Sequence, residues 1–253
     1  MSLAHGSPGF FDGDLFKPNQ KPDHFAVLIG GHTELRHSGN ISLAYQILLE
    51  EGYDRRDVFI LSPREEEAPP YFPTATPTTI DAFRELFSLL KKLIEPHDTL
   101  LLYVTGHGRR VEADHYIHDG KGSYSKQILA ESSLVLNDQE DIGKAEVLRL
   151  FETLSPKTTI AIFDICYWGM FSVKKWPSSV IITTALTEET SFGVTFPRAF
   201  WPAFRAIPNP TIAKTFRHAL QHDKGAKTKQ HSPKLQSKEV DPERLTLLGE
   251  NRE

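Results

Sequence analysis

Two side chains that can carry covalent catalysis lie just after predicted buried strands. Cys166 is the single cysteine of the 253-residue chain and closely follows the apolar run 158–163. His107 follows the apolar run 99–105 and has a glycine on each side. Cysteine catalysis needs a thiolate, a group that protonates the leaving amine, and donors for the oxyanion. Imidazole titrates near neutral pH, so the pair predicts thiol chemistry with Cys166 as nucleophile and His107 as acid/base.

Backbone amides beside this pair are the candidate oxyanion donors. Gly108 lets the chain approach a substrate closely, because glycine has no side chain and turns freely. Its amide and the amide of Cys166 can both point at a carbonyl oxygen. A lone cysteine is nevertheless often an inert buried side chain, and a loop histidine can simply end a strand. The residue types alone therefore leave the catalytic interpretation open.

The elements that must position these residues alternate between short apolar runs and segments of helical periodicity. This alternation is typical of an α/β fold, an open and mostly parallel sheet of about six strands flanked by helices. Sites in such sheets gather at the carboxyl ends of the strands, which brings Cys166 and His107 to one edge. Strands are expected at 24–30, 58–61, 99–105, 134–136, 158–163 and 180–185, and helices at 39–52, 78–94, 141–154, 197–206 and 211–222.

Composition divides the chain into three parts. Residues 1–22 are rich in glycine and proline and predict a flexible lead-in. Residues 23–222 hold all the predicted strands and helices and form one domain, with a hairpin expected at 115–124 around Asp119 and Gly120. Residues 223–253 are polar, and their composition predicts a mobile tail.

Charge and cysteine content exclude several classes of protein. One cysteine rules out an internal disulfide. The formal net charge of -4 does not suit a nucleic-acid binder, which is usually basic. No run approaches the ~18 apolar residues of a membrane span, and the polar start lacks a signal-peptide pattern. We therefore expect a cytoplasmic protein whose partner is a peptide or protein substrate; its oligomeric state is left open.

Five segments in order resemble the legumain family of cysteine peptidases, and more loosely the caspases, over roughly residues 24–235. The Gly-His-Gly turn around His107 matches the catalytic histidine segment, and Cys166 matches the nucleophile. The resemblance implies the caspase–hemoglobinase fold, a three-layer α/β sandwich. It also implies an endopeptidase that cleaves after Asn or Asp and needs no metal or cofactor. The matching segments are 25–31 with 35–37 and 43–45, 101–108, 134–138, 159–166 with 169–171, and 182–185 with 189–192.

The resemblance further implies a substrate pocket. Arg36 matches the arginine at its floor, Asp164 an acid that faces it, and Ser191 a serine of its wall. An arginine presents a planar fork of donors to a carboxylate or an amide oxygen. Paired with an acid it suits Asn, whose amide both accepts and donates. Two positions depart from the family, since Trp168 replaces a serine and Glu34 stands where legumains carry an Asn that orients the histidine.

Three other interpretations stay open. A transamidase or ligase shares every step up to the thioester with a hydrolase. The departures at Trp168 and Glu34 are compatible with an inactive relative that only binds peptides. A metal hydrolase would need a ligand cluster, although the candidate histidines lack the helical spacing of a zinc pair. The candidate ligands are His107, Asp114, His115, His118 and Asp119.

Overall fold

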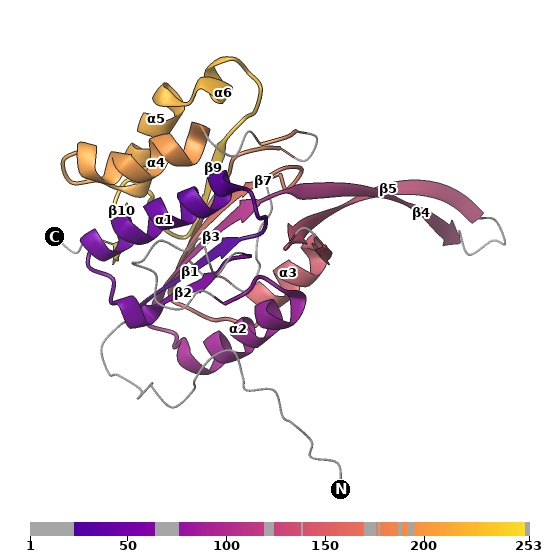
Figure 1. Cartoon of the computed structure of the whole chain (residues 1–253), viewed down its shortest axis with the longest axis horizontal. Coiled ribbons are helices and arrows are strands. Elements are labelled where there is room, and N and C mark those ends of the chain that lie inside the picture. The colour runs from indigo at the N-terminus through magenta and orange to yellow at the C-terminus, as the bar shows by residue number, and fades with distance from the viewer. Residues whose placement is uncertain are drawn as a thin grey trace, which may run out of the picture.

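A central sheet with helices on both of its faces forms the body of the molecule (Figure 1). The predicted lead-in, residues 1–22, lies outside the described part of the chain. The computed structural model describes residues 23–63, 76–118, 124–137, 139–169, 176, 178–186, 189–191 and 195–250, with the backbone alone at 111–118, 124–131 and 250.

Five parallel strands and one antiparallel edge strand make up the main sheet, in the order β2-β1-β3-β7-β8-β9. The five parallel strands are nearly continuous apolar runs, because helices cover both faces of a parallel sheet. The predicted α/β fold with a mostly parallel sheet of six strands is confirmed. The strands are β1 (His24–Gly30), β2 (Val58–Leu61), β3 (Thr99–Gly106), β7 (Thr158–Ile165), β8 (Ser178–Thr183) and β9 (Lys234–Lys238).

Two hydrophobic layers pack the helices onto the sheet. Alternate residues of β1 enter opposite layers, with Val27 facing α2 (Ile80–Leu93) and α3 (Lys144–Phe151). Leu28 faces the other layer, which holds α1 (Leu35–Glu50), α4 (Thr195–Ala206) and α5 (Ile212–His222). The result is a three-layer sandwich. None of the described helices is long and apolar enough to cross a membrane. A short 3-10 helix, η2 (Arg55–Asp57), precedes β2.

A long two-stranded ribbon projects from the body (Figure 1). It consists of β4 (Gly108–His118) and β5 (Tyr124–Leu136), which pair in register from Gly108↔Leu134 to His118↔Tyr124. The expected hairpin is therefore real and longer than predicted, while its turn, 119–123, lies outside the described residues. β6 (Glu140–Gly143) pairs with the base of β5. That pairing converts the start of the helix expected at 141–154 into a strand.

The polar C-terminal segment is built into the fold, so the prediction of a mobile tail is wrong for residues 223–250. It forms α6 (Lys224–Lys227), β9, and the small pair β10 (Leu245–Thr246) and β11 (Gly249–Glu250). The segment β9 is polar because an edge strand needs only backbone hydrogen bonds to its neighbour and one of its faces meets water. The domain therefore extends to 250.

Candidate active site

The sheet brings the histidine and the cysteine to one edge. Strands β3 and β7 are parallel neighbours, and their last pair in register is Gly106↔Ile165. His107 and Cys166 are the next residues of the two chains. They leave the carboxyl ends of adjacent strands, where open α/β sheets form their sites.

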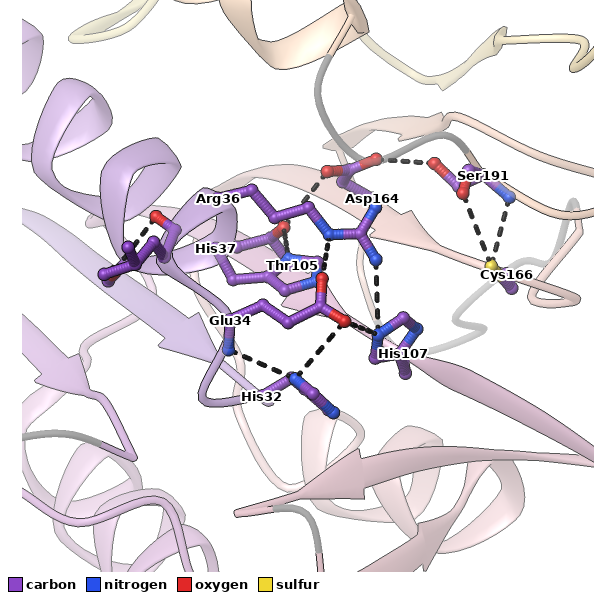
Figure 2. Close-up of polar contacts among 11 residues, drawn as sticks. His32, Glu34, Arg36, His37, Thr105, His107, Asp164, Cys166 and Ser191 are labelled. Atoms are coloured by element: carbon purple, nitrogen blue, oxygen red, sulfur yellow. Dashed lines mark hydrogen bonds and ion pairs between the residues drawn. The ribbon is translucent and has the colours of Figure 1, made fainter.

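One nitrogen of His107 is held by the start of α1. Its Nε2 lies 2.9 Å from Oε1 of Glu34 and 3.2 Å from Nη2 of Arg36 (Figure 2). The other carboxylate oxygen of Glu34 lies 2.5 Å from Nε of Arg36. The hydrogen bond to His107, with help from Arg36, lowers the pKa of Glu34 to about 2. An ionised Glu34 thus accepts the Nε2 proton of His107, which leaves the lone pair on Nδ1.

Glu34 holds Nε2 of His107 at the position where the resemblance to legumains implies an Asn. Glu34 is the N-cap residue of α1, yet its side chain makes no capping hydrogen bond. The carboxylate contacts Nε2 of His107 instead. In Figure 2, Glu34 lies on one side of the His107 ring and Cys166 on the other. Among the described contacts no hydrogen bond joins His107 to Cys166, and such bonds often tighten only when substrate is bound.

The sulfur of Cys166 is almost buried and accepts backbone hydrogen bonds. Cys166 is 9% exposed. Its Sγ accepts from the amide of Ser191 at 3.2 Å and from the amide of Gly108. Burial raises the pKa of the thiol, and the two amides partly oppose that rise. The amide of Gly108, expected to be an oxyanion donor, is therefore next to the nucleophile.

Gly108 is packed too tightly for any side chain. A Cβ atom there would overlap the carbonyl oxygen of Cys166 and lie 2.8 Å from Cγ2 of Ile165. Glycine thus lets β4 pass directly over the residue that carries the thiol, the close approach that the sequence pattern predicts.

Asp164 lies behind the site and is inaccessible to a substrate. It is 1% exposed. Its Oδ2 accepts from the hydroxyl of Thr105 at 3.0 Å, and its Oδ1 lies 2.7 Å from the hydroxyl of Ser191 and 3.0 Å from that of Thr184. Burial raises the pKa of Asp164, and the hydroxyl groups oppose that rise. The expectation that Asp164 faces a substrate pocket is therefore wrong.

Ser191 is partly exposed, but its hydroxyl is directed at Asp164. Its hydroxyl is bonded to Asp164, while its backbone touches the sulfur of Cys166. The structure thus joins Asp164, Ser191 and Cys166 in one set of contacts that supports the thiol. Of the three residues assigned to the pocket, Arg36 is the one whose side chain lies beside His107 and is partly exposed, at 27%.

The turn after the nucleophile is strained and firmly held. Tyr167 has a φ of 62°, a left-handed backbone conformation that residues other than glycine rarely adopt. Its amide donates to the carbonyl of Glu189 and its carbonyl accepts from Ser132. Trp168 is fully buried and stacks on Phe163 at 5.5 Å. The tryptophan that departs from the family pattern therefore fills the core and does not obstruct the site.

Two more contacts fix this region. Lys144 donates to the carbonyl of Trp168, and burial lowers the pKa of this amine to about 8. Glu189 accepts from both the amide and the hydroxyl of Ser232 at 2.9 Å. The segment before β9 thus holds the loop that carries Ser191.

Two further histidines, His32 and His37, lie beside the ring of His107. The rings of His32 and His37 lie 4.3 and 5.5 Å from it, both edge-on. His37 is buried, which together with Arg36 lowers its pKa to about 3. Its Nδ1 lies 2.8 Å from the hydroxyl of Thr105. One atom each of His32, Glu34 and His107 lie within 4.8 Å of one another, so the three can hold a metal ion.

This trio differs from the metal cluster that the sequence suggests. The side chains at 114–119 lie outside the described residues. The residue pattern of the sequence gives His32 no role. The signal that points to it is topological, because β1 and β3 are parallel neighbours and both end at this edge.

Comparison with known proteins extends only to the fold. No family model matches the chain, and no curated protein matches its sequence. Among solved structures, the chain is similar to the protein GSU0716 from Geobacter sulfurreducens, with a TM-score of 0.59 and 12% identity. The similarity covers 90% of this chain and 97% of that one. At this identity the likeness supports the α/β architecture alone.

Proposed function

We propose that the chain is a cysteine endopeptidase of the legumain–caspase type that cleaves after Asn or Asp. The observation that carries the proposal is the placement of His107 and Cys166 at the ends of adjacent parallel strands. Glu34 holds Nε2 of His107 and leaves Nδ1 to exchange protons with the thiol.

In the proposed reaction, Cys166 Sγ attacks the peptide carbonyl carbon, and its proton passes to Nδ1 of His107. The C–N bond then breaks, and His107 gives the proton to the leaving amine. Water, deprotonated by His107, hydrolyses the thioester. The amides of Gly108 and Cys166 hold the oxyanion, an effect worth about 3–4 kcal/mol for one strong donor.

Arg36 is the proposed determinant of specificity. Its guanidinium lies against His107 and Glu34, so a side chain that enters beside the histidine meets a positive fork. An Asp carboxylate or an Asn amide oxygen is the matching acceptor. Asp164 acts indirectly in this proposal, by fixing Ser191 and through it the sulfur.

The nucleophile is tested with reporter peptides that carry Asn, Asp or Leu before the scissile bond. Cys166→Ala lowers cleavage at least about 10⁴-fold, because no second thiol exists in the chain. A peptide probe that reacts with thiols labels the wild type and leaves this variant unlabelled. Undiminished cleavage by Cys166→Ala contradicts the mechanism, and a wild type that binds the peptides without cleaving them indicates the binding-protein alternative.

Specificity is tested with a matched arginine pair. Arg36→Ala lowers kcat/KM for Asn and Asp reporters about 10²-fold, the cost of losing one partner of a charged contact. Arg205→Ala removes a surface arginine that pairs with Glu50 and leaves cleavage unchanged. Equal activity in both variants would remove Arg36 from the pocket while leaving the thiol mechanism in place.

A further inference from the structure

Ligand atoms of two segments converge at the proposed catalytic histidine. One ligand atom each of His32 and Glu34, which precede α1, and of His107, which follows β3, lie within 4.8 Å of one another. Oε1 of Glu34 is 2.9 Å from Nε2 of His107 and 3.9 Å from Nδ1 of His32. Two imidazoles and one carboxylate form a ligand set typical of zinc.

Two of the three separations between ligand atoms are close to those of a zinc site. Zinc binds nitrogen and oxygen ligands at about 2.0–2.2 Å in a tetrahedron, which sets neighbouring ligand atoms about 3.3 Å apart. The two separations to Glu34 straddle that value. The three side chains are 21%, 43% and 34% exposed for His32, Glu34 and His107, so an ion can reach them and water can fill the fourth position.

The protonation states favour His32 and Glu34 as ligands. Nδ1 of His32 accepts the backbone N–H of Glu34 at 3.2 Å, so this nitrogen is unprotonated, and a metal bound to it takes the place of that hydrogen bond. Glu34 is ionised in its contact with His107 and Arg36. At His107 the metal replaces the proton on Nε2, which is released to solvent.

Arg36 contacts two of the three proposed ligands, and Nε2 of His107 is the atom that it shares with a metal. Its Nε lies 2.5 Å from Oε2 of Glu34, and its Nη2 lies 3.2 Å from Nε2 of His107. A divalent ion at the trio repels the guanidinium and takes over the carboxylate. Metal and arginine therefore exclude each other at Nε2 of His107.

We propose that His32, Glu34 and His107 form a binding site for zinc or a similar divalent ion, and that the bound ion switches the thiol chemistry off. The second half rests on the proposed peptidase function. A metal on Nε2 withdraws electrons from the His107 ring and takes its Glu34 partner away. It also displaces Arg36 from the position proposed for substrate recognition.

Binding is measured by calorimetry with zinc chloride on the full chain. Wild type binds zinc in the micromolar range, and His32→Ala weakens that binding at least about tenfold. His218→Ala is the contrasting variant, because His218 and His222 are four residues apart on α5, the helical spacing of a zinc pair, and form the competing site. If His218→Ala weakens the binding and His32→Ala does not, the trio is not the zinc site. Arg36→Gln tightens the binding by about tenfold, since it removes a positive charge beside the ion.

Cys166→Ala separates this site from simple thiol capture. The variant keeps the zinc affinity of the wild type, because the sulfur is not a ligand. Loss of binding in Cys166→Ala, or equal affinity in wild type and His32→Ala, overturns the metal site. Far-UV circular dichroism without metal verifies that His32→Ala is folded.

Inhibition is measured as the zinc concentration that halves reporter cleavage. That concentration rises at least about tenfold in His32→Ala and is unchanged in His218→Ala. If saturating zinc leaves wild-type cleavage intact, the regulatory half is wrong. If the wild type cleaves no reporter, the proposed function fails and the regulatory half fails with it, while calorimetry still decides the metal site.

Discussion

At the scale of single residues, two opposing influences act on the thiol of Cys166. Burial raises its pKa, and the amides of Ser191 and Gly108 lower it in part. The net direction is upward, so the folded protein holds a protonated thiol at neutral pH. The proposed reaction therefore uses His107 as a general base and does not start from a preformed thiolate.

This protonation state predicts how alkylation of the native protein depends on pH. The rate with iodoacetamide rises with pH and has not levelled where that of an ordinary thiol does, because burial raises the pKa of Cys166 and only the thiolate reacts. The rate constant is measured between pH 6 and 10, a range that includes the ordinary thiol pKa of about 8.5. The urea-unfolded chain is the control and levels near that ordinary value. A native rate that is already flat at neutral pH would contradict the general-base scheme.

At the scale of elements, the site depends on how closely two strands can pass. Strand β4 begins at Gly108, directly over the carbonyl of Cys166 at the end of β7. Helix α1 begins at Leu35, immediately after the residue that holds His107. The start of α1 and the start of β4 therefore define the geometry around the thiol.

A pair of glycine substitutions tests this packing. Gly108→Ala lowers the free energy of unfolding by about 1–3 kcal/mol, since its Cβ overlaps backbone atoms that must move. Gly39→Ala is the matched control, because Gly39 is an exposed residue of α1 whose added Cβ meets nothing within 4 Å. It raises the free energy of unfolding by about 0.5–1 kcal/mol through helix propensity. Urea unfolding measures both, and equal stability of the two variants would refute the close approach.

At the scale of the whole molecule, the C-terminal segment joins the sheet edge, the helix layer and the site. Leu245 and Leu247 are fully buried in the layer of α1, α4 and α5. The hydroxyl of Tyr53 donates to the carbonyl of Leu247 at 2.7 Å. Ser232 fixes Glu189 in the loop beside the thiol. Residues after 222 thus support both the core and the nucleophile.

Two adjacent leucines test whether this segment belongs to the core. Leu247→Ala lowers the free energy of unfolding by about 2–5 kcal/mol, the usual cost of a cavity in a packed core. Leu248 is 38% exposed, and Leu248→Ala costs no more than about 1 kcal/mol. Tryptophan fluorescence during urea unfolding reports both values. Two neutral substitutions would mean that the segment is detached from the fold.

Several features of the fold could be predicted because their signals are local. The apolar runs around Val27 and Ile162 identify strands buried on both faces. The helix expected at 78–94 has two threonines at its start, either of which suits an N-cap, and the hydroxyl oxygen of Thr79 accepts from the amide of Ala82. The start of α1 was missed, since Arg36 and Ser38 carry no apolar periodicity.

The polar edge strand was missed for a related reason. The segment Lys234–Lys238 pairs with β8 through its backbone, and backbone hydrogen bonds leave no mark on side-chain composition. The burial of Leu245 and Leu247 depends on helices α1, α4 and α5, which lie elsewhere in the chain. Composition alone therefore described this segment as a tail.

The sequence by itself determined which strand ends carry His107 and Cys166, because hydrophobic runs mark buried parallel strands and their order sets the sheet edge. Only the tertiary structure decided what these residues touch. Glu34 reaches His107 across 73 residues of sequence, and Asp164 turns inward to three hydroxyl groups. Such contacts depend on packing between distant segments and on side-chain rotamers, neither of which a local pattern encodes.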